Sequence, residues 1–352
     1  MKFLYVIGSI ALTILCWGLY GPVIHKGQHD MRYMDGTESV NAMLLPFFFV
    51  GIAYFLIAVA VPALILGRRG ESGHWSVGGS LWSLLAGATG AIGALGIILA
   101  FKSGGHPVYV MPIVFGGAPI VNSLITAGMN KLTKKIGPVF IAGLMMVILG
   151  AVTVLVCKPP PDDLAVGPPL SLPSLLWVIG AIVVTVACWG AYGPFLHRGQ
   201  MKMEGSRLRP LLCVGLAYFG IAVAVPTVLL SAGTDGGWAS FTPSGTCWSL
   251  AAGAAGVFGS LGIIMAFNWG GKPIYVMPLV FGGAPVVNTV ATMLRQNDTG
   301  SISPFFWSGL ILVIAGAVLV MVFAPKGHLG KIDEPVASQD RAQPGSKTPS
   351  EM

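Results

Sequence analysis

Ten separate runs of about twenty apolar residues constrain what this chain can fold into more than any other feature. A bilayer hydrocarbon core of roughly 30 Å needs about 20 residues of α-helix to cross it, and the runs have this length. The sequence therefore predicts an all-α integral membrane protein with ten transmembrane helices. They cover residues 3–22, 44–66, 79–101, 108–128, 138–157, 174–194, 210–231, 246–267, 274–294 and 304–324.

Composition excludes several classes of protein. Only 9% of the 352 residues are charged, against about 25% in a soluble domain, which argues against a soluble enzyme, a DNA-binding protein and a disordered scaffold. The net charge of +7 comes from basic residues in short separate loops, so we expect no nucleic-acid partner. The five cysteines have no C-x-x-C spacing, and we expect no metal and no other cofactor.

The chain repeats itself at offsets of 164 to 172 residues. The segment CWGLYGPVIHKGQ (16–28) recurs as CWGAYGPFLHRGQ (188–200), and VGIAYFLIAVAVP, ending at Pro62, matches VGLAYFGIAVAVP, ending at Pro226. Such self-similarity indicates a duplicated five-helix unit. The predicted parts are a first five-helix repeat (1–157), a Pro-rich linker (158–173), a second five-helix repeat (174–324) and a disordered cytoplasmic tail (325–352).

An odd number of helices in each repeat has a topological consequence. The second repeat must enter the membrane from the opposite side, so we expect inverted-topology repeats. In secondary transporters this arrangement supplies two near-equivalent conformations around a site near the midplane. The side that holds both termini carries 15 Lys and Arg residues, against 5 on the other side. The positive-inside rule then predicts cytoplasmic N and C termini and a multi-pass protein of the cytoplasmic (inner) membrane.

The fourth and ninth runs are the most similar between the halves. Gly105–Asn122 and Gly271–Asn288 are identical at 14 of 18 positions. Each interior proline lacks an N–H and pushes away the carbonyl four residues earlier, which then needs another partner. Gly/Pro interruptions at corresponding positions of two halves point to a substrate site, although such kinks can also serve packing alone. The candidate substrate-binding residues here are Phe115, Gly116, Gly117, Pro119, Asn122, Phe281, Gly282, Gly283, Pro285 and Asn288.

Aromatic residues recur at matching positions of four other runs. In the first and sixth runs a tryptophan and a tyrosine stand three residues apart, and so they share a helix face. Aromatic faces with a polar edge suit a polyhydroxylated or heterocyclic solute, which needs stacking area and a few hydrogen bonds. Anchoring at the membrane interface is the alternative. The further candidate substrate-binding residues are Trp17, Tyr20, Trp189 and Tyr192, with Tyr54 and Tyr218 near the middle of the second and seventh runs.

Glycines stand at every third position of the third and eighth runs. Small residues let helix backbones approach closely in lipid. A step of three residues turns the stripe by about 60°, so it can serve two neighbouring helices or leave room beside a cavity. We interpret both stripes mainly as packing. They are Gly87, Gly90, Gly93 and Gly96 in one half and Gly253, Gly256, Gly259 and Gly262 in the other.

Basic pairs end the first and sixth predicted helices. His25 and Lys26 face one side of the membrane, and His197 and Arg198 face the other. They are gate candidates that could attract an anion, whereas snorkelling charges at helix ends are the commoner case.

What the ten runs lack also bears on function. They contain no Asp or Glu, the residues that usually bind the coupling proton or sodium ion inside a membrane. A facilitator or an exchanger is therefore as plausible as a symporter. The chain has no Walker-type phosphate loop, which excludes ATP as the direct energy source. The runs hold no Ser/His, paired Asp or His-rich set at depth, and we expect no enzymatic activity.

Ten helices as two inverted fives, Cys16-Trp17-Gly18 with its copy in the sixth run, and the interrupted fourth and ninth runs resemble the drug/metabolite transporter superfamily, which includes EamA-like proteins. With the Arg209-Pro210 opening of the seventh run, the chain is most similar to the branch of glucose/ribose porters, rhamnose transporters and plant ureide permeases. The resemblance implies a central cavity lined by the first, third, fourth, sixth, eighth and ninth helices. The Tyr-Gly-Pro that follows Trp-Gly here differs from the small polar residues of the ureide branch, so the substrate does not transfer.

The functional hypothesis is a secondary transporter that moves a small organic solute, sugar-like or another metabolite, by alternating access. Its expected partners are this solute and membrane lipids, with a homodimer left open. One alternative is an exporter of amino acids or drugs. Another is a non-transporting membrane protein, such as a lipid scramblase or a component of a larger assembly.

Overall fold

The computed structural model describes nine stretches of the chain. Most of the predicted linker, to residue 170, and the predicted tail from residue 326 lie outside them. The described residues are 2–32, 43–68, 70–105, 107–131, 136–157, 171–232, 238, 241–296 and 303–325.

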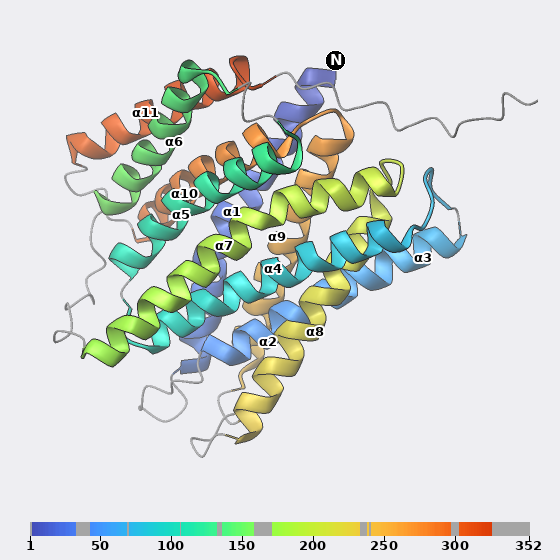
Figure 1. Cartoon of the computed structure of the whole chain (residues 1–352). Coiled ribbons are helices and arrows are strands. Elements are labelled where there is room, and N and C mark those ends of the chain that lie inside the picture. Colours follow the sequence, from blue (N-terminus) through green and yellow to red (C-terminus); the bar gives the residue numbers. More distant parts are fainter. Residues whose placement is uncertain are drawn as a thin grey trace, which may run out of the picture.

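Every described regular element is a helix (Figure 1). The first half comprises α1 (Lys2–Arg32), α2 (Leu44–Ala53), the π-helical segment η2 (Tyr54–Ala60), α3 (Val61–Arg68), α4 (Val77–Lys102), α5 (Pro107–Met129) and α6 (Pro138–Val156). The second half comprises α7 (Leu172–Lys202), α8 (Leu208–Ala232), α9 (Pro243–Asn268), α10 (Pro273–Gln296) and α11 (Pro304–Val322).

The predicted number of membrane-spanning segments is confirmed within the described residues. Ten helical segments, with α2, η2 and α3 counted as one, are long and apolar enough to cross a membrane. The part of the chain that the structure describes is therefore all-helical, and the chain is a multi-pass membrane protein. The predicted ranges agree to within a few residues except at the C-terminal ends of α1 and α7.

Those two ends correct the prediction. The expected ends were residues 22 and 194, but α1 continues to Arg32 and α7 continues to Lys202. Hydropathy falls where polar residues begin, whereas a helix needs only its backbone hydrogen bonds and a surface to pack against. The extensions have such a surface, because Gly27 of α1 packs on the start of α9 and Gly199 of α7 packs on the start of α4.

Eight of the helices form a ring. Following contacts between neighbours, its order is α5, α7, α4, α8, α2 with η2, α9, α1, α10 and back to α5. The two remaining helices, α6 and α11, pair with each other outside the ring and pack against α5 and α10 (Figure 1). The interior of the ring is where side chains from both halves of the chain can meet.

The glycine stripes of α4 and α9 pack against two neighbours each, as the 60° step allows. In α4, a Cβ at Gly87 would meet the backbone of Val214 in α8, whereas one at Gly93 or Gly96 would meet Trp189 or Thr185 in α7. The stripe in α9 repeats this against α2 and α1, where Gly259 adjoins Trp17. The packing interpretation of the stripes is confirmed.

A methyl group added to this contact should destabilise the ring. In Gly87→Ala the new Cβ would lie 2.7 Å from the Cα of Val214, a backbone atom that cannot move aside locally. We expect a loss of about 1–3 kcal/mol, seen as a lower midpoint of thermal unfolding in detergent. Gly220→Ala in α8 is the control, because nothing lies within 4 Å of that position. It should be neutral or stabilising by roughly 0.5–1 kcal/mol. Equal midpoints for both variants would contradict the assigned contact.

Candidate functional site

Five aromatic side chains from four helices meet inside the ring. The ring of Trp17 (α1) lies 5.9 Å from that of Tyr192 (α7) and 6.4 Å from that of Phe281 (α10). Phe281 also lies 6.2 Å from Phe115 (α5) and stacks on Trp189 (α7) at 6.5 Å. These spacings are those of interacting aromatic rings. All five are among the residues predicted from the sequence.

The two tryptophans of this cluster are held in the same way. The indole N–H of Trp17 donates to the carbonyl of Gly256 at 3.2 Å, and that of Trp189 donates to the carbonyl of Gly90 at 3.3 Å. Each indole lies over the next glycine of the stripe, where a side chain would leave no room. The packing stripe therefore also orients the aromatic walls.

Tyrosines form a second group beside the first. Tyr54 and Tyr218 stack face to face with 3.8 Å between ring centroids and 4° between planes, and Tyr20 lies beside Tyr218. Ser260 lies beside the hydroxyls of Tyr54 and Tyr192. The Tyr192 hydroxyl is buried and has no well-formed hydrogen bond within the described residues. The tyrosines, together with Ser260, thus bring polar groups to the interior of the ring.

The structure brings together the eight aromatic members of the predicted site. Six segments of the ring supply them: α1, η2, α5, α7, α8 and α10. Some remain partly exposed although their neighbours are other members of the group, namely Trp17, Tyr20, Phe115 and Trp189. Tyr54, Tyr192, Tyr218 and Phe281 are buried.

The Gly/Pro segments differ from the expected interrupted form. Both α5 and α10 run as continuous helices through their prolines, and Pro119 and Pro285 are buried. Gly116 faces Val152 and Ile148 of α6, and Gly282 faces Val147 of the same helix.

The second glycine of each pair faces α7 or α1. A Cβ at Gly117 would meet Val186, and one at Gly283 would meet Ile14. All four glycines of the two pairs thus adjoin packed aliphatic side chains. At these four positions the atoms nearest to an added Cβ belong to aliphatic residues and not to the aromatic group.

Asn122 and Asn288 lie close to the repeated Tyr-Gly-Pro segments. The amide of Asn122 donates to the carbonyl of Pro273 at 2.8 Å and so ties α5 to the start of α10, while its buried Oδ1 has no partner within the described residues. A Cβ at Gly193 would lie 3.2 Å from that Oδ1, and one at Gly21 would meet the amide nitrogen of Asn288. Each asparagine therefore adjoins the first helix of one half.

The four gate candidates lie within helices rather than at their ends. His25 is exposed, and Lys26 forms an ion pair of 2.6 Å with Asp30 one turn further on. In α7, the His197 ring meets Phe267 edge to face at 5.0 Å, and the exposed Arg198 lies 5.2 Å from the Trp82 ring centroid. The equivalent pairs thus have different partners.

Asp30 corrects the expectation of spans without acidic residues. The candidate span of α1 reaches Met31, so it includes this carboxylate near its end. Besides Lys26, the carboxylate accepts a hydrogen bond from Ser244 at 2.6 Å, and its backbone carbonyl accepts one from Thr242 at 3.2 Å. Asp30 ties the end of α1 to the start of α9.

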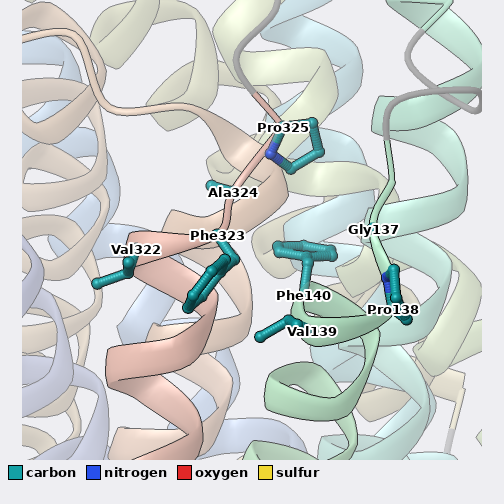
Figure 2. Close-up of a pocket in the computed structure, with 8 residues that line it drawn as sticks. All are labelled: Gly137, Pro138, Val139, Phe140, Val322, Phe323, Ala324 and Pro325. Atoms are coloured by element: carbon teal, nitrogen blue, oxygen red, sulfur yellow. The ribbon is translucent and has the colours of Figure 1, made fainter.

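A shallow surface pocket of about 440 Å³ lies away from the aromatic group, between the start of α6 and the end of α11. Figure 2 shows Phe140 and Phe323 close to each other there, with backbone from both helices around them. Its lining carries no charged or hydrogen-bonding side chain, which gives it little means of orienting a solute. The lining residues are Gly137, Pro138, Val139, Phe140, Val322, Phe323, Ala324 and Pro325.

Several polar residues of the interior were not predicted. Thr13 bonds to the carbonyl of Gly259 at 3.0 Å, and its counterpart Thr185 bonds to that of Gly93 at 3.2 Å. Their recurrence 172 residues apart was a usable signal. Ser260 had no such signal in the sequence, because Ala94 occupies the matching position in the first half.

Glu71, between α3 and α4, is a further polar centre that was not predicted. Its carboxylate accepts hydrogen bonds from the Ser206 hydroxyl at 2.6 Å, the Leu208 amide at 3.0 Å and the Arg207 amide at 3.0 Å. Burial alone would raise the pKa of this carboxyl, but these bonds, with that from the Arg207 side chain, outweigh it and hold the pKa below its ordinary value. Glu71 fastens the loop after α3 to the start of α8.

No protein-family model matches the chain, and no curated protein matches it. A solved structure described only as "Crystal structure of protein" is similar, with a TM-score of 0.61 and 16% sequence identity over 91% of this chain and 97% of that one. At this identity the likeness concerns the fold alone.

The lowered pKa makes the contribution of Glu71 dependent on pH. A carboxyl whose pKa is depressed by folding stabilises the folded state above its unfolded pKa, and the contribution is lost as the pH falls through the folded value. We expect Glu71→Gln to lower the thermal midpoint at pH 7, and the gap to the parent to close below about pH 4. The measurement is thermal unfolding in detergent across this range, with Glu204→Gln as the exposed control in the neighbouring turn. A gap that persists unchanged at low pH would contradict the assigned role.

Proposed function

We propose that the chain is a secondary transporter of the cytoplasmic membrane that moves a small organic solute, sugar-like or another metabolite, by alternating access. Its two halves act as inverted repeats, with both termini in the cytoplasm. The solute binds inside the ring, between the aromatic side chains. The resemblance of the sequence motifs to the drug/metabolite transporter superfamily supports this class.

One observation carries the proposal: eight aromatic residues from six segments converge in the interior of a helical ring. Their walls are pre-oriented, because Trp17 and Trp189 are fixed by backbone carbonyls of the glycine stripes. Their flat faces offer stacking area, and the tyrosine hydroxyls offer hydrogen bonds. These are the two kinds of contact that a polyhydroxylated or heterocyclic solute needs.

Corresponding contacts between the halves support the role of two inverted repeats. Thr13 and Trp17 bond to α9 as Thr185 and Trp189 bond to α4. In addition, the stacked Tyr54 and Tyr218 are equivalent residues of the two copies. Inverted repeats that make equivalent contacts can adopt two conformations of similar energy, one open to each side of the membrane. Alternating access requires two such conformations.

The proposal is tested by uptake into vesicles that contain the purified full chain. The probes are radiolabelled D-ribose, uracil and L-alanine, which separate sugars, nucleobase-like solutes and amino acids. For the probe that is taken up, Trp17→Ala and Trp189→Ala should raise KM about 5- to 10-fold through lost stacking. Trp177→Ala is the control, since this α7 residue is 73% exposed. An unchanged KM in both site variants would place the solute elsewhere, and failure to take up any small organic solute in a wider screen would argue against transport.

The proposed orientation is tested by thiol labelling in intact cells, in a background without native cysteines. The side chain of Glu204, between α7 and α8, is 63% exposed, and Phe241 before α9 is 48% exposed. A membrane-impermeant maleimide should react with the Phe241→Cys variant directly. It should react with the Glu204→Cys variant only after the cells are permeabilised. The reverse pattern would invert the topology.

A further inference from the structure

The two copies of the Cys-Trp-Gly motif have nearly the same sequence but different environments. In α7, Tyr192, Leu196 and Gln200 are buried, with exposed fractions of 4%, 0% and 2%. Their equivalents in α1 are all partly exposed: Tyr20, Ile24 and Gln28. In each helix the three residues are spaced by four and therefore form one stripe along one face. One stripe is covered, and the other is only partly covered.

The covered stripe faces across the ring. The side-chain amide of Gln200 donates to the carbonyl of Ile264 in α9 at 3.1 Å, and its buried Oε1 has no partner within the described residues. The same contact in the other half would join Gln28 of α1 to Ile98 of α4, at the sequence offset of the repeats. Gln28 is instead partly exposed.

A neighbouring contact differs between the halves in the same sense. Phe267, which meets His197, is 6% exposed, while its equivalent Phe101 is partly exposed. All these differences make the half of the ring around Gln200 tighter.

The same asymmetry holds for whole helices. Across the ring, α7 packs against both α9 and α10. The equivalent pairs, α1 with α4 and α1 with α5, make no comparable packing contact within the described residues. We call the region around the C-terminal part of α7 the Gln200 end and that around the C-terminal part of α1 the Gln28 end. The Gln200 end is closed, and the Gln28 end is looser.

We propose that Gln28 and Gln200 are the two alternating closures of the pathway. When the Gln28 end closes, the Gln28 amide bonds to the carbonyl of Ile98, and the Gln200 amide leaves Ile264. The present structure is then the state open at the Gln28 end, which is the outer side in the proposed orientation. This inference rests on the proposed function, and it assigns the closures to specific residues.

Thiol accessibility in the full chain tests this exchange without any solute. Two reporter variants, Phe101→Cys at the Gln28 end and Phe267→Cys at the Gln200 end, leave both glutamines in place and are built in a background where the five native cysteines are alanine. In detergent, a maleimide should label the Phe101→Cys reporter at least about 10-fold faster than the Phe267→Cys reporter, since Phe267 is buried and Phe101 is partly exposed.

A second substitution, too bulky for the closed Gln200 end, then shifts the protein toward the opposite state. Leu196→Trp cannot fit where Leu196 is fully buried, so it should open the Gln200 end. We expect labelling of the Phe267→Cys reporter to rise about 10-fold and labelling of the Phe101→Cys reporter to fall by a similar factor. Ile24→Trp is the matched control: Ile24 is partly exposed in this state, so labelling should match that of the parent. If Leu196→Trp is not monodisperse in detergent, Leu196→Glu takes its place, with the same expected exchange.

Each outcome decides the inference. A rise at the Phe267→Cys reporter without a fall at the Phe101→Cys reporter would show that the ends are not coupled and would overturn it. No change at either reporter would also overturn it. Because labelling needs no solute, exchange can be established even if the uptake screen fails. Conversely, uptake without exchange would leave transport standing and remove these closures.

Discussion

The close approach of α1 to α9 and of α7 to α4 is the contact on which the rest of the structure depends. In lipid the hydrophobic effect does not drive helices together, so association relies on packing and on hydrogen bonds between helices. The glycine stripes supply both, because they admit the neighbouring helix and leave carbonyls within reach of Thr13 and Trp17 in one half and Thr185 and Trp189 in the other. The same contacts set the direction of the indole rings. Stability of the bundle and orientation of the candidate site thus arise from one interface.

Much of the fold and of the candidate site could be predicted from the sequence, because the sequence patterns that mark them are local. A run of twenty apolar residues marks a span by itself, and a three-residue glycine step marks a packing stripe by itself. The aromatic group was also found, since its members recur in both halves at corresponding positions. The tryptophans and tyrosines are large enough that their helices bring them together across the ring.

Other features depend on neighbours that a sequence does not reveal. Gly116 and Gly282 are candidate substrate-binding residues, and the sequence does not reveal that an added Cβ at either position would meet α6. The polar C-terminal ends of α1 and α7 are helical because they pack against the starts of α9 and α4. The π-helical segment from Tyr54 to Ala60 has no counterpart in α8, although the two sequences match closely. Similar residues thus take different forms when their surroundings differ.

If the aromatic group binds a solute as proposed, the indole hydrogen bonds have a consequence for its selectivity. With their N–H groups already bonded to the backbone, Trp17 and Trp189 present only π-faces to a solute. A π-face senses flatness and apolar area, and it is indifferent to the position of a single hydroxyl group. Fine discrimination between isomers falls to the tyrosine hydroxyls, of which that of Tyr192 is still without a well-formed bond within the described residues. Shape would thus be selected by the indole faces and hydroxyl position by the tyrosines. This combination suits a protein that accepts a set of related solutes and rejects those of the wrong shape.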